Sequence, residues 1–363
     1  MSRKLKRLND DILSCNSRIA TKQCLLAERA IYFGRRGDAE LAHADLAEIE
    51  KISPSPDLRV SALRNICYGV LDFYCAEGKN SIDKAMRGYS LAAAGKLFPE
   101  KALSAAWLSH FFDSRHDVES ACRFAMEALA LTPPDSHDTR SRAELVIAQN
   151  LGIAGRPDLA APWYSSVLQH ANATGDDLTV SALMFNRSME RVSCWRQSKL
   201  QWQQEQVRPA VEAAAAASAF EFDVMVGNHG LQNLNPLLRA QILSLSNSYQ
   251  AALDIYSTHL PRQDFALRMQ ADFIADHSLC LFYVGKPNEA RDMMETAVKK
   301  LIPETHPDDR AATFSRASIL YRELGDVYQS EKYGAVAAEL WKNYSMLQLR
   351  MISMFSKIPH QSS

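Results

Sequence analysis

Residues 26–54, LAERAIYFGRRGDAELAHADLAEIEKISP, contain the pattern that decides the fold. Two segments with apolar residues at helical spacing flank a short polar turn at Gly37-Asp38, and Pro54 follows the second segment. A glycine permits the left-handed backbone of a tight turn between helices, and the small Ala42 lets the second helix approach the first closely. The stretch therefore predicts an antiparallel pair of helices, a helical hairpin.

Similar turns recur along the chain, at residues 37, 78, 116, 155, 247, 285 and 325. The successive intervals are 41, 38, 39, 92, 38 and 40 residues, so the interval of 92 spans about two periods and hides one degenerate repeat. A period of about 40 residues with a turn inside each unit is typical of a solenoid of helical hairpins, in which each unit packs on its neighbours.

This pattern resembles the tetratricopeptide family. The positions that carry the resemblance are Leu26, Ala30, Phe33, Gly37, Ala42, Leu46, Ile49 and Pro54 in the first unit, Leu108, Ser109, Phe112, Ala121, Ala125, Ala128 and Pro133 in the third, and Ser278, Leu281, Gly285, Ala290, Ala297, Ser318, Tyr321, Gly325 and Ala337 in the last two. The units are longer than the 34 residues of that family, and Ser330 and Gly334 replace expected alanine and aromatic residues. Such long units look like those of bacterial regulatory proteins.

The resemblance covers about residues 20–342 and implies an all-α fold. We expect a right-handed superhelical solenoid of about eight tetratricopeptide-like helix-turn-helix repeats with terminal capping helices. The chain is then one domain, residues 1–363, with an N-terminal helix in 1–20, repeats in 21–342 and a capping helix and tail in 343–363. The segment 195–236 is irregular, and we interpret it either as a lengthened unit with a loop or as a break in the superhelix.

The composition agrees with this prediction. The chain of 363 residues has 41 Lys and Arg against 42 Asp and Glu. Because these charges nearly cancel, the chain has no excess of positive charge to neutralise phosphates, which argues against nucleic acid as a partner. Glycine and proline number 14 each, fewer than a fold of strands and tight turns needs. Seven cysteines without a CxxC pair favour a reducing compartment, and no stretch of 18 apolar residues occurs. We therefore expect a cytoplasmic protein without a membrane span.

The chain shows no catalytic, cofactor-binding or metal-binding motif, so we do not expect an enzyme. Gly88 and Gly95 are separated by six residues rather than the four of a phosphate loop, and Leu97 stands where Ser or Thr is needed. The polar cluster around His306 is interpreted as a loop in which Asp308 caps the next helix. The basic N-terminal residues, among them Lys4, are expected to be solvated.

Binding is the better hypothesis for such a scaffold. In the tetratricopeptide register the first helix of each unit lines a concave groove, and a protein or peptide partner is expected there. The candidate partner-binding residues are Glu28, Arg35, Trp107, His110, Asn186, Arg187, Asp276, Tyr283 and Arg316. Aromatic and arginine side chains are typical anchors of such surfaces. Three alternatives remain open: Trp107 packs between units, Arg316 is a solvated charge, and Asn186 faces solvent.

The function that fits these observations is a non-enzymatic scaffold or adaptor that binds a protein or peptide in its groove. The alternative is a regulatory sensor that binds a signal peptide or metabolite and controls a separate signalling or transcription output. Neither a DNA-binding helix-turn-helix nor a cyclase motif follows residue 342, so we expect a sensor to act through another protein, or the chain to be a fragment of a larger regulator.

Overall fold

A computed structural model describes residues 2–15, 18–52, 57–76, 78–201, 209–229, 234–260 and 267–360. Every long regular element within these ranges is an α-helix, and they contain no β-sheet. The helices are α1 (Arg3–Ser14), α2 (Ile19–Arg36), α3 (Ala39–Ile52), α4 (Leu58–Cys75), α5 (Ser81–Ala94), α6 (Phe98–Asp113), α7 (Val118–Leu131), α8 (His137–Ile153), α9 (Pro157–Thr174), α10 (Asp177–Leu200), α11 (Pro209–Val226), α13 (Leu234–Leu245), α14 (Tyr249–His259), α15 (Leu267–Tyr283), α16 (Pro287–Lys299), α17 (Pro307–Glu323) and α18 (Val327–Phe355).

From α2 onward, these helices pack as eight successive antiparallel hairpins, α2–α3 to α17–α18, which confirms the predicted all-α solenoid. All seven predicted turns contain a residue with positive φ. Five of these residues are glycines, and the other two are His116 at 61° and Asn247 at 62°. The alanine five residues after the turn is buried in three hairpins, at Ala42, Ala160 and Ala290, and this small side chain is what lets the paired helices approach closely.

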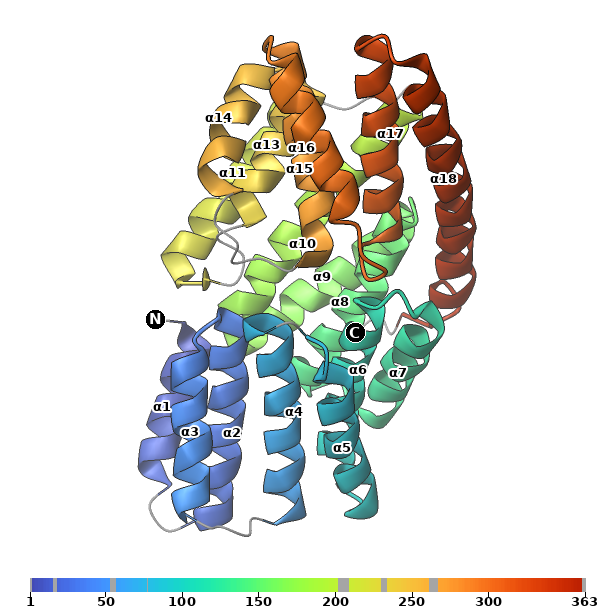
Figure 1. Cartoon of the computed structure of the whole chain (residues 1–363). Coiled ribbons are helices and arrows are strands. Elements are labelled where there is room, and N and C mark those ends of the chain that lie inside the picture. The colour runs from blue at the N-terminus through green and yellow to red at the C-terminus, as the bar shows by residue number, and fades with distance from the viewer. Residues whose placement is uncertain are drawn as a thin grey trace.

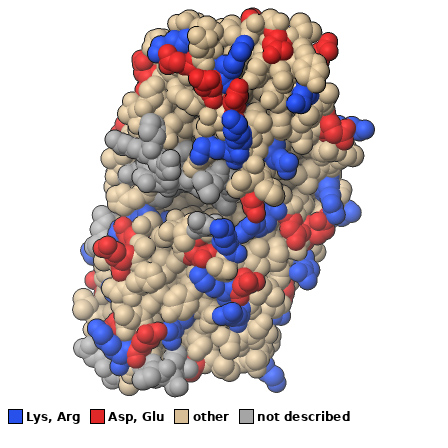
Figure 2. Space-filling view, viewed as in Figure 1, with Lys and Arg blue, Asp and Glu red and all other residues tan. Residues whose placement is uncertain are grey.

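The array has two halves (Figure 1). Helices α1–α7 form one group, here called the N-terminal half, and α11–α18 form the other, the C-terminal half. Helices α8, α9 and α10 lie between them and form the waist. The space-filling view shows a hollow at the waist, and on this face cationic and anionic side chains are interspersed (Figure 2). No field of one sign covers the visible face.

The first helix is fastened to the waist. Lys4 is only 8% exposed, and its Nζ lies 2.6 Å from Asp138 Oδ1 and 3.3 Å from Asp176 Oδ2. The backbone N–H of Lys4 also donates to the carbonyl of Gly175. The expectation of a solvated basic N-terminus is therefore wrong for Lys4, because two carboxylates of the waist neutralise its charge.

The separate capping helix expected in 343–363 does not exist as such. Helix α18 continues without a break through 29 residues, because no glycine or proline interrupts residues 335–355. Its C-terminal half runs back beside α7 and α8 (Figure 1). There Met351, Phe355 and Ile358 join an apolar cluster with residues of α7, α8 and α9. The end of the chain thus packs on the middle of the array.

Within the described helices, none is long and apolar enough to cross a lipid bilayer.

Candidate functional site

A cavity of about 190 Å³ lies where the two halves face each other at the waist. We call it the waist pocket. The C-terminal ends of the first helices of the N-terminal half meet there with the N-terminal ends of α15 and α17. Its polar lining residues include His110, Asp113, His116, Gln149, Asn150, Arg196, Gln241, Asp272, His306, Asp308 and Asp309. A ligand in this pocket would contact both halves at once.

One wall of the waist pocket is a buried network of charges. Arg196 of α10, 2% exposed, donates to Asp272 of α15 at 2.5 Å and to Asp309 of α17 at 2.8 Å, and it also pairs with Asp308. Arg316 donates from Nη1 to the other oxygen of Asp272 at 2.5 Å. Arg196 therefore connects the waist to two helices of the C-terminal half.

The network contains more carboxylates than guanidinium groups. Asp272, Asp276, Asp308 and Asp309 stand against two arginines, so two negative charges remain when His306 is neutral. The pKa of His306 is raised by Asp308, although burial opposes this. Burial and the neighbouring Asp308 raise the pKa of Asp309 to about 7. With His306 charged, four carboxylates face two guanidinium groups and one imidazolium, which leaves one negative charge, and Asp309 holds a proton for part of the time at neutral pH. The wall is therefore weakly electronegative.

The two halves also touch beside the pocket, where His116 and His306 line it. The His116 ring, in the turn after α6, lies 4.6 Å from the His306 ring in a perpendicular arrangement. His116 Nε2 lies 3.4 Å from the Glu304 carbonyl oxygen, and Arg115 lies 3.8 Å from the Glu304 carboxylate. These contacts join residues that are almost 190 positions apart in the chain. They close the superhelix on one side.

An aromatic wall continues from the pocket into the N-terminal half. Tyr74 stacks on His110 at 6.2 Å, and its hydroxyl lies 3.3 Å from His110 Nε2. Trp107 packs edge-on against both rings. The guanidinium of Arg142, on α8, lies 4.3 Å from the centroid of the Trp107 ring. Four first-helix side chains from three successive units thus form one continuous, largely buried cluster, of which His110 lines the pocket.

The structure places the predicted groove residues in three different environments. His110 lines the pocket, and Asn186 donates at 2.9 Å to Gln149, which also lines it. Arg35 faces the interior, where it donates to Asp176 at 2.7 Å and to Thr179 at 2.9 Å. The structure therefore brings these residues to the inner surface, and Asn186 does not simply face solvent.

Three others are corrected because they are buried. Trp107 is 2% exposed and packs between α4, α6 and α8, which was the alternative interpretation. Arg316 is 1% exposed and Asp276 is 2% exposed, since they pair with each other at 3.0 Å. Arg316 is thus neither a solvated charge nor a groove anchor.

The remaining three lie away from the pocket. Arg187 is exposed and lies over the Tyr164 ring of α9 at 5.6 Å. Tyr283 is 43% exposed and stacks on Tyr249 at the far end of α15. Glu28 is half-buried, and burial together with Asp138 raises its pKa.

The cluster around His306 was interpreted only in part correctly. It is a loop between repeats, but His306 occupies the N-cap position of α17 and no side chain caps that helix. Asp308 pairs with His306 and Arg196 instead. Arg196 itself was missed because it lies in the irregular segment 195–236, where the repeat register that predicts inward-facing positions is lost. No group of three or more metal-ligand side chains occurs among the residues described.

A histidine next to this network makes stability sensitive to acid. His277 is 8% exposed, and neither ring nitrogen has a hydrogen-bond partner among the described residues. Burial lowers its pKa to about 4. Below pH 6.5, the ordinary pKa of histidine, His277 binds a proton in the unfolded chain but stays neutral in the folded chain until about pH 4. The free energy of unfolding therefore decreases as the pH falls from about 6.5 to about 4.

We expect His277→Phe to remove this contribution, roughly 1–3 kcal/mol at pH 4. Urea unfolding of both proteins at pH 7.5 and pH 4.5 gives the loss in the free energy of unfolding on acidification. The contribution of His277 is the loss in the wild type minus the loss in the variant. The solvated His43 provides the control, since His43→Gln should leave the pH dependence unchanged. An identical acid loss in His277→Phe and wild type would contradict the assignment.

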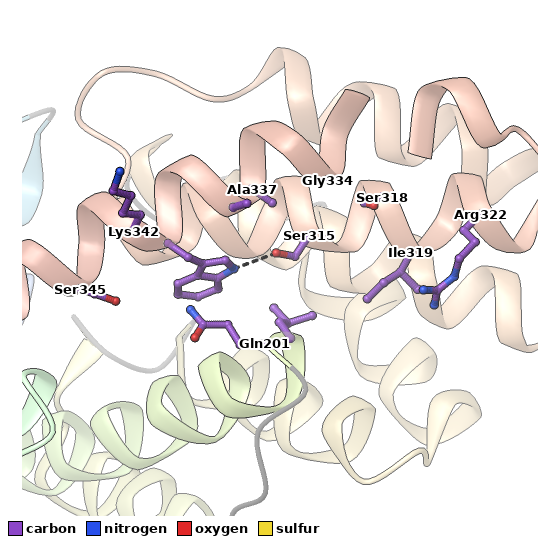
Figure 3. Close-up of a pocket in the computed structure, with 12 residues that line it drawn as sticks. Gln201, Ser315, Ser318, Ile319, Arg322, Gly334, Ala337, Lys342 and Ser345 are labelled. Carbon is purple, nitrogen blue, oxygen red and sulfur yellow. Dashed lines mark hydrogen bonds between the residues drawn. The ribbon is translucent and has the colours of Figure 1, made fainter. Parts of the chain in front are cut away.

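A second cavity, of about 500 Å³, lies between α17, α18 and the end of α10. Figure 3 shows Ser315, Ser318, Ile319 and Arg322 along α17, with Gln201 facing them from α10. The indole of Trp341 forms part of its floor and donates to Ser315 Oγ at 2.9 Å. Its remaining lining is mostly small side chains of α18. Unlike this cavity, the waist pocket is lined by residues of both halves.

Comparison with known proteins gives the fold. No family model and no curated protein matches the chain. Among solved structures, it is similar to a Rap protein complexed with Competence and Sporulation Factor, with a TM-score of 0.57 and 13% identity over 94% of this chain and 92% of that chain. It is also similar to NprR in complex with its cognate peptide NprX, with a TM-score of 0.54 and 9% identity over 93% and 94% of the two chains. The apo form of RapI gives a TM-score of 0.50 and 14% identity over 94% and 98%.

Proposed function

We propose that this protein is a non-enzymatic regulator that binds a short peptide in the waist pocket and acts on a separate output protein. The observation that carries the proposal is the lining of the pocket by residues of both halves, from His110 to Asp309. A peptide held there must alter how the halves meet. The likeness to NprR in complex with its cognate peptide supports the proposal, because a chain of similar fold binds a peptide.

The size of the pocket favours the sensor over the adaptor. A volume of about 190 Å³ is smaller than the roughly 300–1,000 Å³ of common ligand sites. The contacts of His116 and Arg115 with Glu304 also hold the two halves together beside the pocket. A helix of a partner protein does not fit this space, and a peptide enters only when the halves separate. Binding and conformational change are therefore the same event, as a sensor requires.

The electronegative wall favours a peptide with a basic group. A cation beside Asp309 stabilises its ionised form, so the peptide competes with the proton that the raised pKa retains. We expect affinity to increase as the pH rises from 6 to 8. The ligand displaces no ion pair in this interaction, because Arg196 stays between the three aspartates.

The proposal is tested by affinity selection from a synthetic pool of randomised pentapeptides. We expect wild type to retain a small set of sequences rich in Lys or Arg, and Asp309→Asn to bind them about 10-fold or more weakly, since the lost charge pair is partly buried. Asp158→Asn is the matched control, because Asp158 is exposed and pairs only with Arg156. If wild type retains no peptide, or if Asp309→Asn retains the same peptides equally well, the proposal fails.

A further inference from the structure

Arg142 is a buried cation that no carboxylate of the described residues contacts directly, although the buried Asp176 acts on it from a distance. The side chain is 5% exposed, and its guanidinium lies over Trp107 and beside the Tyr74 hydroxyl. No carboxylate of the described residues makes an ion pair with it. The other interior arginines differ, because Arg35 pairs with Asp176 and Arg196 with three aspartates. Burial and the nearby Arg35 lower the pKa of Arg142 to about 10.

Such a group is unfavourable in the free protein. Taking a guanidinium out of water costs free energy that only an anion at hydrogen-bond distance offsets in full. Trp107 and Tyr74 offset it in part and hold the guanidinium plane in one orientation. A planar, oriented guanidinium is well suited to a carboxylate, which accepts two parallel N–H bonds from it.

The place of Arg142 connects it to the waist pocket. Its neighbours Tyr74 and Trp107 both contact His110, which lines the pocket. On α8 itself, Gln149 lines the pocket seven residues after Arg142, which is about 10 Å along the helix axis. Three residues of an extended peptide span about the same distance. A short peptide with one end in the pocket therefore reaches Arg142 with the other.

We propose that Arg142 binds a carboxylate group of the peptide and thereby sets its direction in the groove. This inference rests on the proposed function. Arg142 and Trp107 are buried in the free protein, so the peptide must displace the side chains that cover Arg142. Its carboxyl end then lies against Arg142 at the waist, and its basic or amino end lies near Asp272 and Asp309 in the C-terminal half. The two ends of the site carry opposite charge, so the reverse orientation would place like charges together at both ends.

The test uses two randomised pentapeptide pools, one with free C-terminal carboxylates and one with C-terminal amides. We expect wild type to retain the free acids at least about 10-fold better, and Arg142→Met to lose this preference. Enrichment of Asp or Glu in the peptides retained from the amide pool, lost again in Arg142→Met, would show that an acidic side chain supplies the carboxylate. Arg123→Met is the control, since Arg123 lies 4.5 Å over Phe124 on the exposed surface.

A second measurement separates binding from a structural role. The free Arg142→Met protein should melt roughly 2–5 °C higher than wild type, because an uncompensated charge is removed while methionine still packs on Trp107. A lower melting temperature with an unchanged preference for free acids overturns the inference. Equal retention of acid and amide pools by wild type, without enrichment of acidic residues, overturns it and leaves the proposed function standing. Retention of neither pool overturns both.

Discussion

Replacing Arg196 by methionine is expected to lower the free energy of unfolding by roughly 3–5 kcal/mol, because three aspartates lose their shared cation while they remain buried. Asp272 and Asp308 are each less than 5% exposed, so water cannot replace the guanidinium without opening the interface of α10 with α15 and α17. Part of the charge can be relieved by protonation of Asp309, whose pKa is already raised to about 7.

This prediction is checked by urea unfolding followed by circular dichroism at pH 7.5. The matched control is Arg191→Met on the same helix. Arg191 also pairs with a carboxylate, Glu212, at 2.7 Å, but its side chain is 41% exposed, and such pairs contribute at most about 1 kcal/mol. Equal effects of the two substitutions would show that the network does not hold the waist to the C-terminal half.

The second large effect is expected at the C-terminal half of α18. Phe355 is 0% exposed and packs in the cluster that joins α18 to α7, α8 and α9. Phe355→Ala should destabilise the protein by roughly 3–5 kcal/mol, through lost burial and the cavity that remains. Because the contact joins distant parts of the array, we expect hydrogen exchange to accelerate in α7 and α8 as well as in α18.

Phe98→Ala is the control for this substitution. Phe98 begins α6 and is 58% exposed, so its truncation should change stability by about 0.5 kcal/mol or less. If exchange in α7 and α8 is the same in Phe355→Ala and wild type, α18 does not stabilise the middle of the array, and the packing of its end is only a local contact.

The hairpins were predictable because each is a local structure. The positive φ of Gly37, His116 and Asn247 follows from short sequence signals, and so does the burial of Ala42. The repeat register also indicated inward-facing positions such as Arg35 and His110. These predictions need only the spacing of residues within about 20 positions of one another.

The contacts that make the site were not predictable in this way. Arg196 meets Asp308 across 112 positions, and His116 meets Glu304 across 188. Such pairs depend on how far each unit rotates relative to the last, and small rotations add up over eight units. The sequence therefore could not distinguish Arg316, which the closure buries, from a groove anchor. The sequence also did not single out Arg142. That no carboxylate pairs with its guanidinium can be seen only once all the residues around it are placed.

Both ends of the array are tied to its middle, α1 through Lys4 to Asp176 and α18 through Phe355 to α7 and α8. Most repeat proteins can gain or lose a unit, since each repeat interacts only with those next to it. Here an added hairpin would carry one end out of reach of its attachment. The number of repeats is thus coupled to the two attachments, and an engineered insertion of one unit should abolish folding where the same change in an open solenoid would be tolerated.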